Sequence, residues 1–244
     1  MPSRTVRSSG KSASAAKSRP PGSRRTVRLA AERARAVEVI DRLERAMPDV
    51  KIALEFGTDL ELLVSVILSA QSTDVGVNKV TPALFAAFPD AAAYAAAEPE
   101  ALWPHIRSLG LFRNKAKAIV AAMRVIAREH GGRVPRERAA LEALPGVGRK
   151  TAGVVLVHLG AAQAFPVDTH VGRVSRRLGF TREEDPSKVE RELMALVPEE
   201  RWGRGHQLLV WHGRRTCIAR APACSRCPVE DLCPKRGVLP SLRR

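Results

Sequence analysis

The amino-acid sequence predicts an all-α fold. Apolar residues recur every three or four positions through most of the chain, which is the spacing of one face of a helix. No segment shows the apolar–polar alternation that predicts a strand, and no internal repeat is evident. Short connections that carry Pro and Gly separate the helical stretches, as in a compact helical domain. With 244 residues the chain can bury one large core or two modest ones.

The first two predicted helices differ in how much of their surface is apolar. Within residues 32–47 the apolar positions at helical spacing are Val37, Ile40, Leu43 and Met47. Asp59 is expected to cap the next helix, residues 60–70. Because this second segment is apolar nearly all round, we expect it to be a buried central helix.

Three further helices are predicted from their start and stop signals. Pro82 is expected to start a short helix that carries two phenylalanines. A longer helix around residues 119–126 is expected to end at the glycine pair 131–132. Ser187 and Glu190 form the pattern of a capping box, which predicts the start of another helix.

A glycine-rich turn separates two predicted helices, residues 139–143 and residues 151–159. Gly146 and Gly148 are expected to permit positive φ and a close approach of a ligand to the backbone. Consecutive N–H groups at the start of the second helix would bind a DNA phosphate without reading base sequence, although an ordinary helix–helix turn is the alternative. The candidate DNA contacts of this segment are Gly146, Val147, Gly148, Arg149 and Thr151.

Two charged residues near this turn carry the candidate chemistry. Lys150 follows the turn, and an amine at this place is able to attack a sugar carbon. Asp168, eighteen residues further on, supplies a carboxylate that is suited to assist. By residue type alone, Lys150 favours a phosphate contact instead. The position of Asp168, before apolar residues at helical spacing, favours a role as a helix N-cap. From the residues alone, Lys150 is therefore a phosphate contact or a nucleophile, and Asp168 is a cap or a catalytic carboxylate.

The charge of the chain favours a polyanionic partner. The formal net charge is +16, and half of it comes from residues 1–29, which hold eight basic residues and no acidic one. A basic folded part with a cationic arm favours nucleic acid over a merely solvated basic surface. Residues 1–28, rich in Arg, Ser and Ala, are interpreted as a disordered basic tail, with targeting to an organelle as the minor alternative.

All four cysteines lie in one C-terminal segment with the spacing C-x6-C-x2-C-x5-C: Cys217, Cys224, Cys227 and Cys233. No apolar run reaches the roughly 18 residues that span a bilayer, and no signal peptide is evident, so we expect a cytoplasmic protein without membrane contact. Disulfides are not expected in that compartment. Four thiolates this close together predict one metal centre, and from the spacing alone zinc and a [4Fe–4S] cluster both fit.

The segment Leu144–Ala152 resembles the helix-hairpin-helix element of the endonuclease III family of DNA glycosylases. The likeness extends over most of residues 30–234, with several motifs in the right order at the right intervals. Besides the cysteine loop, these motifs are Leu68-Ser69-Ala70-Gln71-Ser72-Thr73-Asp74, Gly110-Leu111-Phe112 and Trp211-His212-Gly213. The resemblance implies that Lys150 is the catalytic lysine, that Asp168 is the catalytic aspartate, and that the cysteines hold one [4Fe–4S] cluster.

The family resemblance implies two helical lobes with a DNA-binding cleft between them. Residues 52–162 would form a six-helix domain that contains the helix-hairpin-helix motif. Residues 29–51 and 163–244 would together form an iron–sulfur cluster domain, whose cluster holds a basic loop against the DNA backbone. Lys150 and Asp168 would then lie on opposite walls of the cleft. A monomer is expected, since an asymmetric lesion needs no two-fold partner.

The same resemblance implies a bifunctional enzyme of base excision repair. It would remove oxidised or damaged pyrimidines from double-stranded DNA and then cleave the abasic (AP) site by β-elimination. The amine of Lys150 would attack C1′ of the damaged nucleotide and form a Schiff base, while Asp168 would stabilise the cationic sugar. An ordinary lysine with a pKa of about 10.4 is only about 0.1% neutral at pH 7.4, so the site has to favour the neutral amine.

A base stacked inside a duplex cannot present C1′ to a lysine, so the nucleotide has to be flipped out. Gln71 and Leu111 match the positions that fill the resulting gap in the family, one by pairing with the orphaned base and one by replacing its stacking. His170 is a candidate substrate contact because it lies two residues after Asp168.

Two alternative functions have to be weighed. An adenine-mismatch glycosylase of the same superfamily would share the fold and the cluster, but that family has no lysine at position 150 and carries an extra recognition domain. A non-catalytic DNA-binding module with a redox-active metal centre would leave Lys150 and Asp168 together unexplained.

Overall fold

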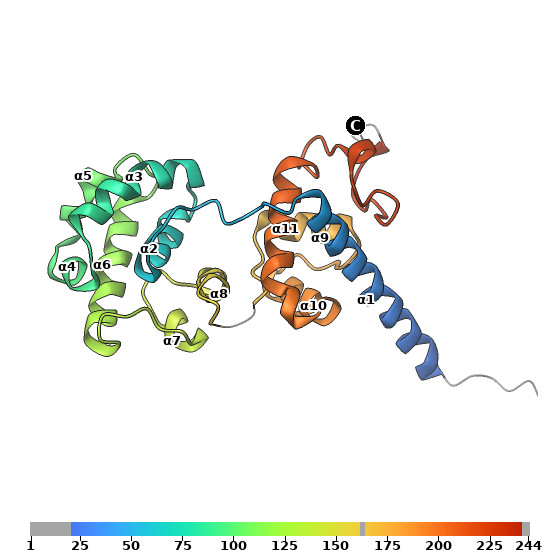
Figure 1. Cartoon of the computed structure of the whole chain (residues 1–244), viewed down its shortest axis with the longest axis horizontal. Helices are drawn as coiled ribbons and strands as arrows, with labels where there is room; N and C mark the ends of the chain where they lie inside the picture. Colours follow the sequence, from blue (N-terminus) through green and yellow to red (C-terminus); the bar gives the residue numbers. More distant parts are fainter. Residues whose placement is uncertain (1–20, 162–163, 241–244) are drawn as a thin grey trace, which may run out of the picture.

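The computed structural model describes residues 21–161 and 164–240. Within these residues the fold is all-α, and no strand is present. Figure 1 shows two helical lobes that lie side by side. Each lobe has its own hydrophobic core, and no buried residue is shared between the two cores. The predicted all-α, two-lobe fold is thereby confirmed.

The first lobe, which we call the hairpin lobe, contains helices α2 to α8. Their bounds are α2 Asp59–Ser69, α3 Asp74–Ala87, α4 Ala91–Ala96, η1 Pro99–Leu102, α5 Trp103–Ile106, α6 Phe112–Glu129, α7 Arg138–Glu142 and α8 Arg149–His158. Helix α2 is the central element, because residues 62–68 are all buried and the helix packs against α3, α6 and α8. The prediction of a buried central helix is therefore correct.

The second lobe, which we call the cluster lobe, is built from both ends of the chain. Its elements are α1 Pro21–Ala46, α9 Thr169–Arg177, α10 Pro186–Leu196, η2 Glu199–Arg201, α11 Trp202–Arg215 and η3 Cys224–Arg226. Helix α11 packs against both α9 and α1, so the N-terminal helix belongs to the C-terminal core. In Figure 1 the blue α1 accordingly lies beside the orange and red elements.

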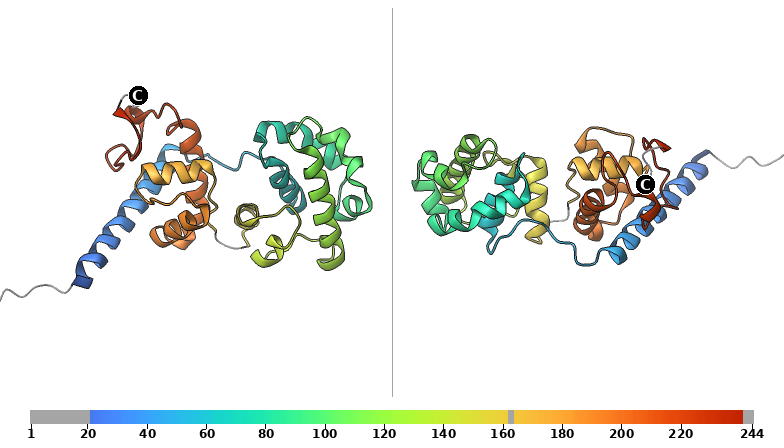
Figure 2. Two further views of the ribbon diagram at one scale, coloured as in Figure 1. Left: turned by 180° about the vertical axis from the view of Figure 1, so that it is seen from behind. Right: turned by 90° about the horizontal axis from the view of Figure 1, so that it is seen from above.

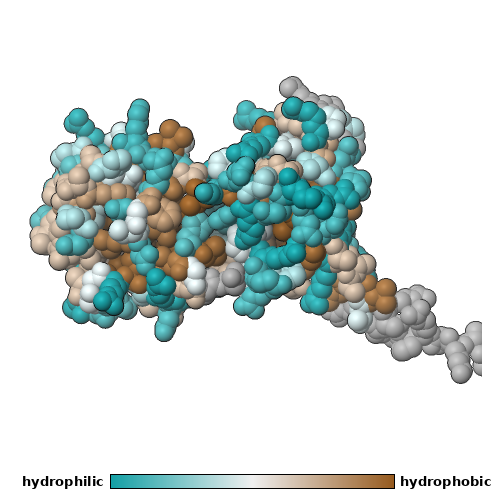
Figure 3. Space-filling view, in the orientation of Figure 1, coloured by the Kyte–Doolittle hydropathy of each residue, from teal (hydrophilic) through white to brown (hydrophobic). Residues whose placement is uncertain are grey.

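The chain passes between the lobes twice, as Figure 2 shows from behind and from above. One crossing joins α1 to α2 and the other joins α8 to α9. On the face seen in Figure 3, hydrophilic side chains gather over the cluster lobe, whereas apolar side chains are more frequent over the hairpin lobe. Among residues 21–161 and 164–240, no helix combines the length and apolar character needed to cross a bilayer.

Two helices begin one or two residues earlier than the capping signals predict. Thr58, and not Asp59, is the N-cap of α2, because its hydroxyl accepts a hydrogen bond from the N–H of Glu61 (3.2 Å). At α10 the predicted capping box is wrong. Asp185 is the cap and Pro186 the first helical residue, which places Ser187 inside the first turn and frees Glu190 for another partner.

Two further helices, α3 and α1, start earlier than predicted. Pro82 lies inside α3, which starts eight residues earlier because the Thr73 hydroxyl accepts a hydrogen bond from the N–H of Gly76 (3.1 Å). Residues 21–28 were predicted to belong to the disordered tail, but they form the start of α1. Proline is tolerated as the first helical residue, Pro21, because the N–H that it lacks would have no partner within the helix. Residues 1–20 of that predicted tail lie outside the described part of the chain.

Candidate active site between the two lobes

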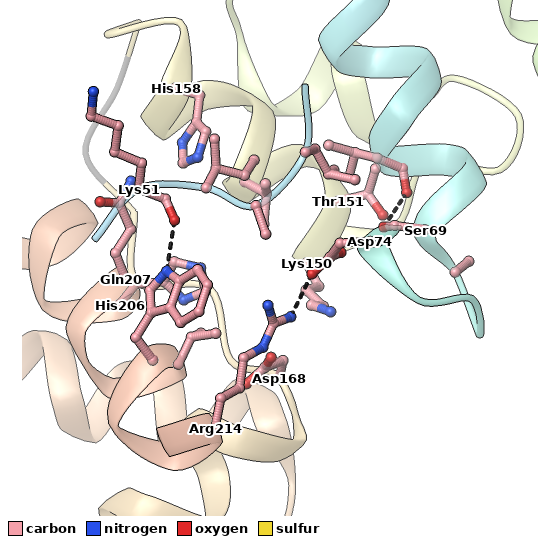
Figure 4. A pocket seen from close by; sticks show the side chains of 18 of the residues that line it. Lys51, Ser69, Asp74, Lys150, Thr151, His158, Asp168, His206, Gln207 and Arg214 are labelled. Atoms are coloured by element: carbon pink, nitrogen blue, oxygen red, sulfur yellow. Dashed lines mark hydrogen bonds and ion pairs between the residues drawn. The ribbon is translucent and has the colours of Figure 1, made fainter. Parts of the chain in front are cut away.

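A cavity of about 240 Å³ lies where the lobes meet (Figure 4). From the hairpin lobe it is lined by one face each of α2 and α8, and from the cluster lobe by Asp168 and one face of α11. The polar lining residues are Lys51, Ser69, Gln71, Asp74, Lys150, Thr151, His158, Asp168, His206, Gln207 and Arg214. The structure therefore brings Lys150, Asp168, Thr151 and Gln71, all named from the sequence, into one cavity.

The glycine-rich turn before α8 uses its two glycines differently. Gly146 has a φ of 77°, and a Cβ there would lie 2.6 Å from the Cβ of Ala118 on α6, so no other residue fits. Gly148 has a φ of −92°, which corrects the prediction of positive φ at this position. A Cβ on Gly148 would meet nothing within 4 Å, so the surface above it is open to a ligand.

Of the residues next to these glycines, Val147 is buried in the core and Arg149 is exposed on the surface. Val147 is only 4% exposed, and its N–H donates to the carbonyl of Leu144 (3.1 Å), so its side chain anchors the turn in the core. Helix α8 starts at Arg149 without any side-chain cap, which leaves its first N–H groups free to meet an anion. Arg149 itself donates through Nε to Glu190 of α10 (2.5 Å) and so joins the two lobes.

Asp168 lies at the start of α9 on the opposite wall of the cavity from α8. Its Oδ1 accepts a hydrogen bond from the N–H of Val171 (2.7 Å), so it is the N-cap of α9 as its position predicts. The carboxylate also lines the cavity together with Lys150, which is exposed in the first turn of α8. The cap and the proposed catalytic role are therefore compatible, because Asp168 caps α9 through Oδ1 and still lines the cavity.

Helix α11 contributes two contacts that close the cavity from the cluster lobe. Trp211 donates through Nε1 to the carbonyl of Lys51 (2.6 Å), and the guanidinium of Arg215 lies 4.5 Å from its ring centre. Arg214 forms an ion pair with Asp74 of α3 (2.7 Å), as drawn in Figure 4. This pair crosses from one lobe to the other. Sequence analysis missed it because nothing in local spacing relates residues 140 positions apart.

Two histidines line the cavity that the sequence analysis did not identify. His206 is buried and donates through Nδ1 to the carbonyl of Pro166 (2.8 Å), and burial lowers its pKa to about 4. His158, on the same helix as Lys150, also has its pKa lowered by burial. Its Nε2 is buried without a hydrogen-bond partner in the described structure. Single histidines carry no sequence signal of such a position.

Gln71 and Leu111 lie in two adjacent loops with strained backbones. Their φ values are 54° and 58°, in the left-handed region that non-glycine residues rarely adopt. A Cβ on Gly110 would lie 3.6 Å from the carbonyl oxygen of Gln71, which shows how close the two loops are. Leu111 is 53% exposed and does not pack in the core. Lys115, buried in α6, donates to the hydroxyl of Ser72 (2.6 Å) and ties the loops together.

His170 lies in the first turn of α9 but does not line the cavity. Arg173 donates a hydrogen bond to Nδ1 of His170 (3.2 Å), and the Cβ of His170 lies close to Gly213 of α11. Burial lowers the pKa of His170, and the nearby Asp168 opposes that shift. The structure thus places His170 in the packing between α9 and α11.

The four cysteines have free thiols that line a second cavity, between the end of α9 and the C-terminal loop. The N–H of Lys235 donates to Sγ of Cys233 (3.3 Å), and Nη1 of Arg177 donates to Sγ of Cys217 (3.4 Å). Such donors stabilise cluster-bound thiolates. Four free thiols around one cavity, with N–H donors directed at two of the sulfurs, fit the all-cysteine ligand set of an iron–sulfur cluster.

Comparison with known proteins decides the family. Residues 64–199 match the model of the HhH-GPD superfamily base excision DNA repair proteins, and residues 217–233 match the iron–sulfur binding domain of endonuclease III. The chain belongs to the endonuclease III family. The predicted cofactor, one [4Fe–4S] cluster, is confirmed by this match, and Cys217, Cys224, Cys227 and Cys233 are the residues that would hold it.

The similarity to individual members extends over most of the chain. Endonuclease III of Synechocystis sp. is 46% identical over 208 residues, which are 85% of this chain and 95% of the relative. Endonuclease III of Escherichia coli strain K12 is 43% identical and covers 82% of this chain and 95% of the relative. A solved structure of a trapped endonuclease III–DNA covalent intermediate matches with a TM-score of 0.79 and 41% identity, over 83% of this chain and 96% of that one.

Proposed function

We propose that this protein is a bifunctional DNA glycosylase and AP lyase of base excision repair that acts on oxidised or damaged pyrimidines in double-stranded DNA. One observation carries the proposal. A lysine and an aspartate, from helices that start on opposite walls, line one cavity beside an uncapped helix N-terminus. Membership of the endonuclease III family supports it, as does the likeness to a covalent DNA complex.

DNA binding rests on the exposed start of α8. The open surface at Gly148 and the free N–H groups of Arg149, Lys150 and Thr151 suit a backbone phosphate. Gln71 and Leu111 are exposed on adjacent strained loops, where they can enter the space left by a flipped nucleotide. His170 is half-buried beside Gly213 and hydrogen-bonded to Arg173, and with its position two residues after Asp168 it stays a proposed substrate contact.

The chemistry proceeds through Lys150. Its neutral Nζ attacks C1′, the bond from C1′ to the base breaks, and the base leaves with a proton. The C1′–O4′ bond then breaks, O4′ takes a proton, and the nitrogen forms a Schiff base with C1′. Loss of a proton from C2′ follows, and the 3′ phosphate leaves by β-elimination. Asp168 uses Oδ1 to cap α9, which leaves Oδ2 to stabilise the cationic sugar and to move protons to and from Lys150.

The cluster lobe contributes structure and not hydrolysis. A cluster on the four cysteines would hold the loop whose carbonyls at Cys217, Ile218 and Ala219 accept hydrogen bonds from Arg177, the last residue of α9. We infer that the working species is a monomer, because the cavity is formed within one chain. The bacterial relatives support a cytoplasmic protein that acts on the nucleoid.

Borohydride trapping tests the proposal. Wild-type protein mixed with a thymine-glycol duplex and borohydride should become covalently linked to DNA, and Lys150→Gln should not. Lys117→Gln, which removes an exposed lysine on α6, is the matched control and should be trapped like wild type. Trapping that persists in Lys150→Gln would refute the assignment of the nucleophile. Wild-type protein that neither excises the base nor is trapped would refute the function.

A further inference from the structure

The face of α8 that carries Lys150 continues deep into the cavity. Lys150, Val154 and His158 recur at intervals of four residues, so they share one side of the helix, and all three line the cavity. Eight residues of helix separate Lys150 from His158 by about 12 Å. Before the attack, a lysine side chain directed at C1′ and the base still bonded to C1′ can together bridge such a span, with the base at the end away from the lysine.

His158 has a polar atom there that nothing in the protein satisfies. Its Nε2 is buried and has no hydrogen-bond partner within the described residues, and His158 itself is one of the residues that line the cavity. A buried polar nitrogen without a partner costs about 1–3 kcal/mol, so folded proteins rarely keep one without a reason. Burial also lowers the pKa of His158, so the ring is neutral and offers one donor and one acceptor.

The neighbours of His158 form a rigid wall. Trp211 is held by its hydrogen bond to the carbonyl of Lys51, and the ring of Trp211 borders the same cavity. His206 is fixed by its bond to Pro166, and since a carbonyl can only accept, Nδ1 carries the proton and Nε2 is an acceptor. Figure 4 shows His158 on one side of this space, with His206 and Gln207 across from it.

We propose that His158 reads the base of the flipped nucleotide, through a hydrogen bond between its imidazole ring and the Watson–Crick edge of a damaged pyrimidine. This inference rests on the proposed function and names a specificity-determining residue within it. His158 takes no part in the chemistry at C1′, because that reaction occurs at the other end of the α8 face. A cavity of about 240 Å³ accommodates a single pyrimidine ring.

The proposal separates the two activities of the enzyme. Removal of a base requires that the base be held in the cavity, whereas cleavage of an abasic site involves no base at all. A residue that reads the base therefore affects only the first activity. A residue that supports Lys150, Asp168 or the fold would affect both.

The test compares single-turnover rates of wild type, His158→Leu and His158→Asn, each purified with its cluster. One duplex carries 5-hydroxyuracil and the other an abasic site at the same position. We expect His158→Leu to lose about tenfold or more in base removal, as for an unsatisfied polar contact, and to keep AP cleavage and borohydride trapping on the abasic duplex within about twofold. His158→Asn should recover part of the loss. His130→Leu, at the end of α6, is the matched control and should retain both rates.

Each other outcome overturns the inference. Equal loss of both activities in His158→Leu would assign His158 to folding or to the support of Lys150. Unchanged base removal would show that the unpartnered nitrogen has no role in substrate binding. Circular dichroism and the absorbance of the cluster identify a variant that fails to fold, and His158→Asn then carries the comparison. Wild-type protein that is inert on both duplexes would refute the proposed function, which is a distinguishable result.

Discussion

The two walls of the cavity are both helix N-termini, and they are built in opposite ways. Helix α8 starts at Gly148 with no side-chain cap and an open surface above it. Helix α9 starts at Asp168, whose own carboxylate caps the helix at 2.7 Å. One N-terminus is therefore left free for a ligand, while the other is closed by the protein and presents a carboxylate. The two helix starts therefore suit different roles, since α8 leaves N–H groups free for an anion and α9 presents a carboxylate that we propose to be catalytic.

The largest effect is expected from separating the charge of Asp168 from its cap. Asparagine caps a helix about as well as aspartate, so Asp168→Asn should change stability by less than about 0.5 kcal/mol. Loss of the carboxylate should lower the rate of base removal about 10²- to 10⁴-fold, the range for a positioned acid–base group. Asp168→Ala should lose the same activity and about 1 kcal/mol of stability as well.

Single-turnover kinetics and urea denaturation measure the two effects of Asp168 separately. Asp185→Asn is the matched control, since Asp185 also caps its helix by accepting from the N–H three residues further on and lies outside the cavity. It should leave activity unchanged. If Asp168→Asn kept full activity, Asp168 would be a helix cap only, and the start of α9 would play no part in catalysis.

The segment that leads into Asp168 depends on a neutral histidine. His206 donates to the carbonyl of Pro166, and burial lowers its pKa from 6.5 to about 4. The unfolded chain therefore binds a proton at higher pH than the folded chain does. The stabilisation is complete above about pH 6.5 and is lost as pH falls toward 4, by up to about 3 kcal/mol. His206→Gln should flatten this part of the stability profile, measured by urea denaturation across pH.

The matched control for His206 is His105→Gln on the hairpin lobe, which should leave the slope unchanged. A slope in His206→Gln as steep as in wild type would assign the acid sensitivity to another group. The turn that leads into α8 is held differently from the segment before Asp168. Backbone hydrogen bonds and the buried side chain of Val147 fix this turn.

The glycines of the α8 wall should respond in opposite ways. Gly146→Ala forces a Cβ into Ala118 at a positive φ and should cost about 1–3 kcal/mol of stability. Gly148→Ala meets no atom within 4 Å and should cost less than about 1 kcal/mol, but it should weaken binding to undamaged duplex several-fold because the phosphate is held further away. Thermal unfolding and fluorescence anisotropy separate the two. Equal effects on binding and stability in both variants would contradict the assignment.

Local patterns in the sequence predict much of this site, and distant pairings do not follow from them. The glycine turn, the cap at Asp168 and the cysteine spacing are each encoded within a few residues, so periodicity and motif chemistry identify them. Helix boundaries follow less closely from local signals, as Pro82 within α3 shows, because tertiary packing overrides such a signal. The unpartnered nitrogen of His158 and the pair between Asp74 and Arg214 arise only when the lobes meet.

A smaller effect is expected at an ion pair that joins α8 to the other lobe. Arg149, next to Lys150, pairs with Glu190 of α10, whose side chain is 6% exposed while that of Arg149 is 48% exposed. Arg149→Ala would leave the buried carboxylate unpaired and should cost about 1–2 kcal/mol, less than a fully buried pair because the arginine is half in water. Adding Glu190→Gln to that variant should restore most of the loss, because a neutral amide is easier to bury. If urea denaturation showed no such recovery, Arg149 would stabilise the wall by packing, and its charge would be available to DNA.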